Sequence, residues 1–390
     1  MGSLGAAASV LPVREALAGP VAAADVTARR PHVGPATVSL ADYCIGDGVE
    51  NDANGVQRAI NDLSSRGGGT LLVPERTYRI QPRGWIQVPD RIRIKGLGSG
   101  ARFLLTQPSR SHFAVAFRIV GDGVCLEDVV LERGNDVYGS FLALLGSRAW
   151  VSDVTMIGNQ ARWRNDFNGA VLASNGSDLD TITLRNVTAH GCGYGLYQSE
   201  ADRSRVWNVV VDNFHGHDNF QDDLGFSAPL GATGKITIQD SRLESNHSTS
   251  IGAGCAIGIA RATDVTIQGC SFTGYPMNPI HVERESNGLI VRNCTFQRVS
   301  TFVTGWGYEA CILLISGSRN ALVEGNTFDL SQQTNNVTGL YAGPGGPGES
   351  DPTGIVLRGN KLVASGPKQL YVNYGVGTVS VDATTYVMAP

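Results

Sequence analysis

The sequence has little charge and few aromatic side chains. Of its 390 residues, 17% are charged and 7% aromatic, whereas average chains carry about 25% charge. The formal net charge of −4 offers no basic surface for nucleic acid or for an anionic membrane. No run approaches the roughly 18 apolar residues of a membrane-spanning helix. We therefore expect neither a nucleic-acid partner nor membrane insertion.

The sequence also lacks the cysteine patterns of metal and redox sites. There is no Cys-x-x-Cys pair and no Cys/His spacing suited to zinc. Three histidines lie near Asp218, at His215, His217 and His247, but their spacing is not diagnostic of a metal site. We predict no metal and no cofactor. We interpret all seven cysteines as core residues: Cys44, Cys125, Cys192, Cys255, Cys270, Cys294 and Cys311.

Glycine, by contrast, is abundant, with 49 residues in a chain that is 42% hydrophobic. This composition excludes a disordered chain. A single compact core stops growing at roughly 250–300 residues. A chain of 390 residues therefore needs either two domains or a repeat architecture that lengthens without thickening.

Two sequence patterns recur about once every 28 residues. Short apolar strands begin at positions spaced by 24 to 32 residues: Phe141, Ala170, Leu196, Leu224, Cys255, Pro279 and Cys311. A polar bend follows the second strand of each unit, at Asp128, Asp153, Asn186, Asn213, Asp240, Gly269, Asn293, Asn326 and Asn360. Asn, Asp and Gly tolerate the left-handed backbone of a sharp bend. The repeat predicts an all-β parallel β-helix, with a thin core of aliphatic residues and cysteine rather than large aromatics.

A helix is expected near residues 52–65, ahead of the repeats. Asp52 is a candidate N-cap, and Val56, Ile60 and Leu63 form one apolar face. A solenoid must cover the open end of its core, so we expect this helix to be an N-terminal cap. We predict one β-helix domain over residues 46–390, after an extension over residues 25–45.

The segment GDGVENDANGVQRAINDLSSRGGGTLLVPERTYRI, residues 46–80, resembles the N-terminal signature of the pectate-lyase-like superfamily. RIRIKGLGSG, residues 91–100, resembles the coil that follows it. The resemblance implies a right-handed parallel β-helix that acts on carbohydrate. It also implies a polysaccharide groove built on the first strand of each coil and the loop before it.

A second, partial resemblance concerns the polygalacturonase-type glycoside hydrolases. Gln-Asp-Asp at 221–223 is similar to a motif of that family, and GAGCAIGI at 252–259 to its Gly-His-Gly segment. Cys255 or Gly254 stands where the family histidine is expected. The preceding coil lacks the third carboxylate, and PIHVERE replaces an Arg-Ile-Lys segment. Only Asp222 and Asp223 carry over, and galacturonate is not assigned as the substrate.

These acids suit glycoside chemistry independently of the resemblance. Glycosidic cleavage uses two carboxyl groups, and adjacent carboxylates raise one another's pKa toward that of a general acid. Glu283 is the candidate second carboxylate, two coils beyond Asp222 and Asp223, so about 10 Å away. That distance is close to the spacing of an inverting pair. We predict Asp222, Asp223 and Glu283 as catalytic residues.

Candidate substrate-binding residues surround these acids. Ile280 and Val282 should point inward, which places His281 and Glu283 outward beside Arg284. Gly225, Ala256 and Gly258 should form a shallow floor. Exposed aromatic rings offer stacking surfaces for sugars. The predicted binding set is His217, Asp218, His281, Arg284, Trp163, Tyr194, Tyr197, Trp306 and Tyr308.

The reaction class remains open between several alternatives. The leading hypothesis is a glycosidase-like enzyme that cleaves or rearranges glycosidic bonds of a polysaccharide. A polysaccharide lyase would use Arg261 or Arg284 as base, with calcium held by Asp218, Asp222 and Asp223. A fructan-rearranging transferase similar to inulin fructotransferase would be a homotrimer without metal. A carbohydrate-binding protein without catalysis is the alternative outside enzymology.

Two further segments carry expectations. Residues 1–24 are Ala-rich and resemble either the end of a signal peptide or a flexible arm, which favours a secreted protein. Residues 340–354 are rich in Gly and Pro and predict a loop that overhangs the groove or meets a neighbouring chain.

Overall fold

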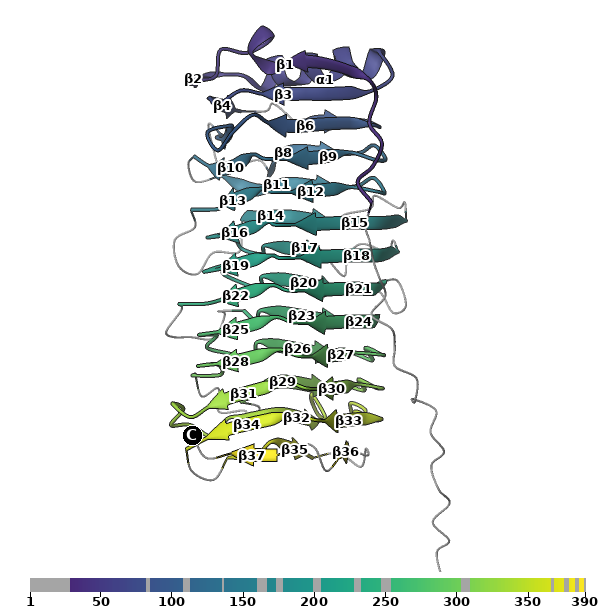
Figure 1. Cartoon of the computed structure of the whole chain (residues 1–390), viewed down its shortest axis with the longest axis vertical. Helices are drawn as coiled ribbons and strands as arrows, with labels where there is room; N and C mark the ends of the chain where they lie inside the picture. Colours follow the sequence, from purple (N-terminus) through teal and green to yellow (C-terminus); the bar gives the residue numbers. More distant parts are fainter. Residues whose placement is uncertain are drawn as a thin grey trace, which may run out of the picture.

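The computed structural model describes residues 29–81, 85–107, 113–134, 137–159, 167–172, 178–198, 205–227, 233–246, 254–302, 309–365, 368–374, 379–382 and 386–388. Within these ranges the chain forms three long parallel sheets, which we call A, B and C. Neighbouring strands of each sheet come from successive coils of the chain, stacked along one axis (Figure 1). The predicted parallel β-solenoid is confirmed.

Sheets A and B each contain 13 strands. Sheet A consists of β1 Ala36–Ser39, β3 Gly69–Val73, β6 Ile92–Gly96, β9 Cys125–Glu127, β12 Trp150–Ser152, β15 Leu179–Arg185, β18 Val206–Asp212, β21 Thr233–Gln239, β24 Ala262–Gln268, β27 Ile290–Arg292, β30 Leu322–Glu324, β33 Ile355–Arg358 and β36 Val379–Val381. Sheet B consists of β2 Asp47–Asn51, β4 Thr77–Ile80, β7 Arg102–Leu105, β10 Val130–Arg133, β13 Thr155–Ile157, β16 Thr188–His190, β19 His215–His217, β22 Arg242–Glu244, β25 Ser271–Thr273, β28 Thr295–Gln297, β31 Thr327–Leu330, β34 Lys361–Ala364 and β37 Tyr386–Met388.

Sheet C has 11 strands and carries the candidate site. Its strands are β5 Trp85–Val88, β8 Phe113–Ile119, β11 Tyr138–Leu144, β14 Phe167–Leu172, β17 Leu196–Gln198, β20 Leu224–Ser227, β23 Ile257–Ala260, β26 Ile280–Glu283, β29 Ala310–Ile315, β32 Thr338–Gly343 and β35 Tyr371–Asn373.

The register of sheet C corrects part of the sequence alignment. Ala170, Leu196 and Leu224 do pair in one row. That row continues through Leu142, Ile257, Ile280 and Ile312, so four of the seven aligned positions lie one or two residues off the row. The coils differ in loop length, and the sequence spacing alone does not reveal where each strand starts to pair.

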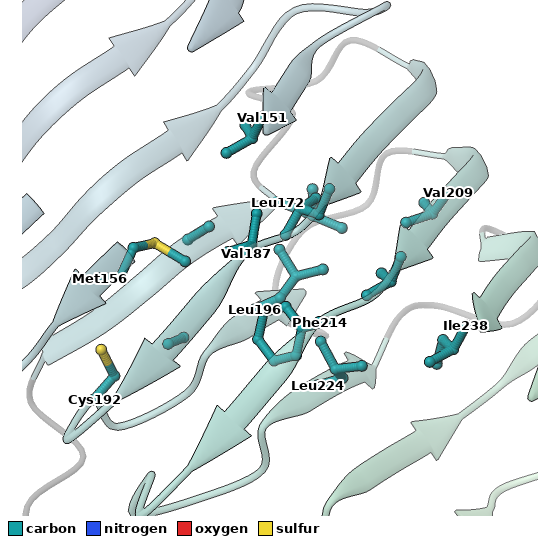
Figure 2. Packing of buried hydrophobic residues seen from close by; sticks show 14 of the residues in the cluster. Val151, Met156, Leu172, Val187, Cys192, Leu196, Val209, Phe214, Leu224 and Ile238 are labelled. Carbon is teal, nitrogen blue, oxygen red and sulfur yellow. The ribbon is translucent and has the colours of Figure 1, made fainter. Parts of the chain in front are cut away.

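The core between the sheets contains stacked aromatic rings as well as aliphatic side chains. Phe272, Phe296 and Phe328 stack from coil to coil with centroids 4.7 and 5.1 Å apart. The expectation of a core without large aromatics was therefore wrong: equivalent positions in successive coils stack phenylalanines face to face. Figure 2 shows aliphatic packing around another phenylalanine, Phe214.

The predicted bends lie at one corner of the solenoid. Seven of the nine adopt left-handed backbone angles, among them Asn186 and Asn213 with φ of 52° and 50°. Side-chain amides link successive bends, since Asn213 Nδ2 donates to Asn186 Oδ1 at 2.8 Å. At the last two predicted bends, Gly325 and Gly359 take the left-handed position instead, and the asparagines that follow them turn into the core.

Those two asparagines form a buried polar ladder. Asn326 and Asn360 have no exposed surface. Asn326 Nδ2 donates to Asn360 Oδ1 at 3.0 Å and to the carbonyl of Val291 at 2.9 Å, while its Oδ1 accepts from the Cys294 amide at 2.9 Å. A residue expected to make a bend therefore serves as an internal hydrogen-bonding group. The cysteines agree with their prediction: all seven are buried and free.

Helix α1, Ala53–Ser65, agrees with the predicted helix, with Val56, Ile60 and Leu63 fully buried. Its first turn differs from the prediction. The Asp52 side chain makes no capping bond to the helix; its Oδ1 instead accepts from the Ile45 amide at 3.1 Å. Asn51 Oδ1 accepts from the Ala53 amide at 3.1 Å. None of the helices in the described ranges has the length and apolar character needed to cross a lipid bilayer.

Candidate active site on sheet C

A cavity of about 510 Å³ lies on the outer face of sheet C, over β17, β20, β23 and β26. Two carboxylates, one imidazole and two phenol rings reach it. The lining residues are Tyr194, Tyr197, Asp222, Gly225, Phe226, Ser227, Cys255, Gly258, Ile259, Ala260, His281 and Glu283.

Two glycines make the surface hollow at this point. Tyr197, Gly225, Gly258 and His281 pair directly in successive coils, so their outward positions form one row along the axis. The side chains of Tyr197 and His281 stand at the two ends of this row, and the glycines leave two coils between them without side chains. The predicted floor is correct for Gly225 and Gly258. Ala256 was misplaced, because it is fully buried in the core.

Asp222 occupies the hollow. Its Oδ1 accepts a hydrogen bond from the Cys255 amide at 3.0 Å. Its Oδ2 lies only 2.2 Å from the position that a Cβ at Gly258 would take, so glycine is required there for the carboxyl group to fit. Burial, aided by the charge of Glu283, raises the pKa of Asp222 to about 7. This carboxyl group can therefore give or take a proton near neutral pH.

Glu283 lies at the far side of the cavity, at the end of β26. Arg284 Nε is 3.2 Å from its Oε1. Burial, followed by the negative charge of Glu349, raises the pKa of Glu283, while Arg261 opposes the rise. The predicted loop 340–354 begins later than expected, because residues 340–343 belong to strand β32, Thr338–Gly343, which pairs with β29. Glu349 lies in the remaining part of the loop, which therefore places a charge near the site. The Gly/Pro content indicated the loop, but nothing in the sequence indicated the proximity of Glu349.

His281 completes the outward face of β26, as predicted, with Ile280 and Val282 buried beneath it. Burial lowers the pKa of His281 to about 4, so the imidazole is neutral at pH 7. Its Nε2 is buried without a hydrogen-bond partner and lies 3.7 Å from Glu283 Oε2. A neutral ring with a free nitrogen is available to a bound substrate.

Two tyrosines form the opposite wall. The rings of Tyr194 and Tyr197 stack with centroids 4.2 Å apart. Tyr194 lies against Gly225, because a Cβ there would be 3.2 Å from its ring carbons. Burial, together with the charge of Asp222, raises the pKa of Tyr194 well above its usual value. The pair is an aromatic surface suited to stacking against a sugar ring.

Asp223 points away from its neighbour Asp222. It is 2% exposed and its Oδ1 accepts from Asn219 Nδ2 at 2.6 Å, while its Oδ2 accepts from the Tyr275 hydroxyl. Burial raises its pKa to about 7. Its carboxyl group lies against Gly216 of sheet B, and it does not line the cavity. Asp222 and Asp223 therefore face different surfaces, because successive side chains of an extended backbone point in opposite directions.

His217 and Asp218 belong to another surface. His217 is on β19 of sheet B, where its ring stacks on His190 with centroids 4.6 Å apart. Its Nδ1 lies 3.2 Å from Asp218 Oδ2. The structure therefore does not bring these two predicted binding residues to the cavity. No group of three or more His, Cys, Asp or Glu in the described ranges is arranged to hold a metal ion.

The remaining predicted aromatic residues, Trp163, Trp306 and Tyr308, lie outside the described residues, as do His247 and residues 1–24. Of the predicted set, the structure brings together Asp222, Glu283, His281, Tyr194 and Tyr197, with Arg284 beside Glu283.

Comparison with known proteins supports the architecture. Residues 149–342 match the family described as right handed beta helix region. The chain is a right-handed parallel β-helix. The handedness expected from the pectate-lyase-like resemblance is thereby confirmed.

The curated relatives with detectable sequence similarity include enzymes of Azotobacter vinelandii. Mannuronan C5-epimerase AlgE1 is 26% identical over 216 residues, which cover 53% of this chain and 14% of the relative. For mannuronan C5-epimerase AlgE4 the values are 26% over 193 residues, 47% and 30%. The chain thus spans less than a third of either relative.

Solved structures with the same fold differ in function. The A-module of mannuronan C-5 epimerase AlgE6 from Azotobacter vinelandii has a TM-score of 0.56 and 17% identity, covering 90% of this chain and 99% of that one. DFA-IIIase from Arthrobacter chlorophenolicus A6 has a TM-score of 0.59 and 11% identity, covering 90% and 93%. PfbA, a surface adhesin of Streptococcus pneumoniae, has a TM-score of 0.61 and 13% identity, covering 86% and 91%. At these identities the likeness concerns the fold alone.

Proposed function

We propose that this protein is a carbohydrate-active enzyme that cleaves or rearranges glycosidic bonds of a polysaccharide or oligosaccharide bound in the cavity on sheet C. One observation carries the proposal: Asp222 is held in a hollow between aromatic and acidic walls, with its pKa raised to about 7. A carboxyl group that remains partly protonated near neutral pH is what protonation of a glycosidic oxygen requires.

In this reaction Asp222 acts as general acid and Glu283 as the second carboxylate. Asp222 precedes β20, but its carboxyl group reaches over Gly258 of β23. Strand β23 pairs directly with β26, which carries Glu283, so the two carboxyl groups are offset by one coil along the axis, about 4.8 Å. Tyr194 and Tyr197 stack against the sugar, and neutral His281 accepts or donates a hydrogen bond to a hydroxyl.

The test combines a substrate panel with a matched pair of variants. Wild type, Asp222→Asn and Asp240→Asn are incubated with plant and microbial polysaccharides, including mannuronan and inulin, and the products are identified by mass spectrometry and NMR. Asp240 is an exposed bend residue of the corner column, where Asn213 occupies the equivalent place. Turnover should fall at least about 100-fold in Asp222→Asn only. Equal turnover in all three proteins would refute the proposal.

A second candidate is modification of a uronic acid by proton transfer at C5, either epimerisation or lyase cleavage. It is favoured by the sequence similarity to mannuronan C5-epimerases and by Arg261 and Arg284 near Glu283, which would pair with a uronate carboxylate. An unsaturated product that absorbs at about 235 nm would identify a lyase by its conjugated double bond. Inverted C5 signals in NMR would identify an epimerase, and loss of activity in chelator would indicate a calcium requirement.

Two other functions can be tested with the same panel of polysaccharides. A fructan-rearranging transferase, favoured by the fold shared with DFA-IIIase, would release a cyclic disaccharide from inulin. We expect that enzyme to be a homotrimer, which light scattering would show. A carbohydrate-binding protein without catalysis would retain polysaccharide in an affinity gel with no product formed.

We further propose that α1 caps the N-terminal end of the core and that the protein acts outside the cell. The capping role is supported by three fully buried side chains, Val56, Ile60 and Leu63. Truncation of Ile60 to Ala should cost about 2–5 kcal/mol in the free energy of unfolding. Fractionation of the producing cells would test the location.

A further inference from the structure

A second cavity, of about 660 Å³, lies near the C-terminal end of sheet C. It is formed by the loops that lead into β32 and β35 and by the outer faces of those strands. The lining residues are Glu309, Thr334, Asn335, Asn336, Val337, Thr338, Tyr341, Lys368, Gln369, Val372 and Tyr374. Most are amides, hydroxyls and aromatic rings, the groups that recognise sugar hydroxyls and sugar C–H faces.

This cavity is separate from the site around Asp222. The outward row that carries Gly258 and His281 continues through Leu313 and Tyr341. Leu313 and Tyr341 are only 3% and 5% exposed, and with Ala310, Ile315 and Val372 they form an apolar cluster apart from the main core. The outer face of β29 is thus buried between the two cavities. Tyr341 lies two coils beyond His281, about 10 Å along the axis.

Its walls are held in place by hydrogen bonds to neighbouring coils. Asn335 Nδ2 donates to the carbonyl of Ser300 at 2.7 Å, and the Lys368 amine donates to the carbonyl of Asn335. The Tyr374 amide donates to the carbonyl of Ala342 at 3.0 Å. The cavity therefore exists before any ligand binds, so binding need not order the walls.

Tyr374 supplies an open aromatic ring. It is 69% exposed, the largest exposed fraction among the exposed large hydrophobic residues of the described ranges. Its ring packs on Tyr341 at 5.5 Å with an interplanar angle of 36°. Tyr341 in turn lies against Gly343, where a Cβ would be 2.9 Å from its ring. The first cavity has a similar contact, between Tyr194 and Gly225.

We propose that this cavity is a second, non-catalytic carbohydrate site, in which a sugar ring stacks on Tyr374 and its hydroxyls bond to the amides and hydroxyls of the walls. The choice of sugar as ligand rests on the proposed function. None of the lining residues belongs to the site around Asp222, so binding here requires no turnover. A polysaccharide engaged at both cavities would be bound more tightly than at either one.

The test counts binding events separately from catalysis. Tri- to pentasaccharide fragments of mannuronan, inulin and neutral glucans are titrated calorimetrically into wild type, Tyr374→Ala, Tyr374→Phe and Asn336→Ala. Wild type should show two sites per chain for one of these sugars. Tyr374→Ala should weaken one site about tenfold, Asn336→Ala should weaken the same site, and Tyr374→Phe should retain it.

Turnover and oligomeric state complete the experiment. Tyr374→Ala should leave turnover of a trisaccharide unchanged, whatever reaction the site around Asp222 performs. The proposal is overturned if no sugar of the panel shows a second site, or if Tyr374→Ala binds as wild type does. It is also overturned if Tyr374→Ala dissociates an oligomer without altering sugar binding, because the cavity would then be a contact between chains. A protein with two sites but no turnover would refute the proposed enzyme and leave this site intact.

Discussion

The Asp222 carboxyl group and the missing side chain of Gly258 occupy one space, since a Cβ at Gly258 would lie 2.2 Å from Asp222 Oδ2. Gly258→Ala should therefore displace the carboxyl group while the strand keeps its backbone. We expect at least a tenfold loss of turnover, because small displacements of a catalytic group are costly. The purified variant should show an unchanged circular dichroism spectrum.

Gly346→Ala is the matched control for that substitution. A Cβ at Gly346 would meet only Glu349 Cδ, at 3.9 Å, so activity should be retained. Wild-type turnover in Gly258→Ala would show that catalysis does not depend on the position of the Asp222 carboxyl group.

The pH dependence of stability should reveal the raised pKa of Asp222. Its folded pKa is about 7, against roughly 3.9 for an unfolded chain. The folded state then binds more protons than the unfolded state between these values, so this group lowers stability as the pH rises from about 4 to 7. Asp222→Asn removes the effect. In urea denaturation it should be more stable than wild type by roughly 1–2 kcal/mol at pH 8, with no gain at pH 4.

The same protonation governs activity. If Asp222 is the general acid, turnover should decline above pH 7 as the carboxyl group ionises. A rate that rises through pH 7 would instead assign Asp222 as a base, as the C5 proton-transfer alternative requires.

Tyr275→Phe tests the role of Asp223. The substitution removes the hydroxyl that donates to the buried carboxyl group and should cost about 1–3 kcal/mol in the free energy of unfolding. If the role of Asp223 is structural, through its hydrogen bonds to Asn219 and Tyr275, kcat should stay at the wild-type value in the folded variant. A selective fall in kcat with unchanged stability would place Asp223 in the reaction.

Asn326→Ala should be among the more damaging polar substitutions. It deletes a fully buried side chain that donates to Asn360 and Val291 and accepts from Cys294. We expect a loss of about 2–4 kcal/mol in chemical denaturation. Asn293→Gly is the control, since Asn293 is a bend residue with φ of 53° and glycine adopts this angle readily. Similar losses of stability in the two variants would contradict the stabilising role of the ladder formed by Asn326 and Asn360.

Several site positions were predictable because strand periodicity decides them. Ile280 and Val282 are apolar and alternate with His281 and Glu283. This alternation alone predicted which side chains of β26 point outward. Asp222 and Asp223 show the limit of this reasoning. Both carboxylates were predicted to be catalytic, yet one lines the cavity and the other bonds to Tyr275, 52 residues away. His217 was misplaced for a similar reason, because closeness in sequence does not indicate which of three sheets a side chain faces.

The sequence by itself determined the architecture, because a recurrent order of apolar strands and polar bends has one economical solution, a stack of coils. It also determined which residue types gather around positions 222 and 281–284. The tertiary structure decided the site, because the register aligns Gly225 and Gly258 between Tyr197 and His281. Only that alignment creates a hollow in which a carboxyl group loses water and its pKa approaches neutrality. The burial of this carboxyl group depends on which residues surround it in space, and the spacing of residues in the sequence does not specify those neighbours.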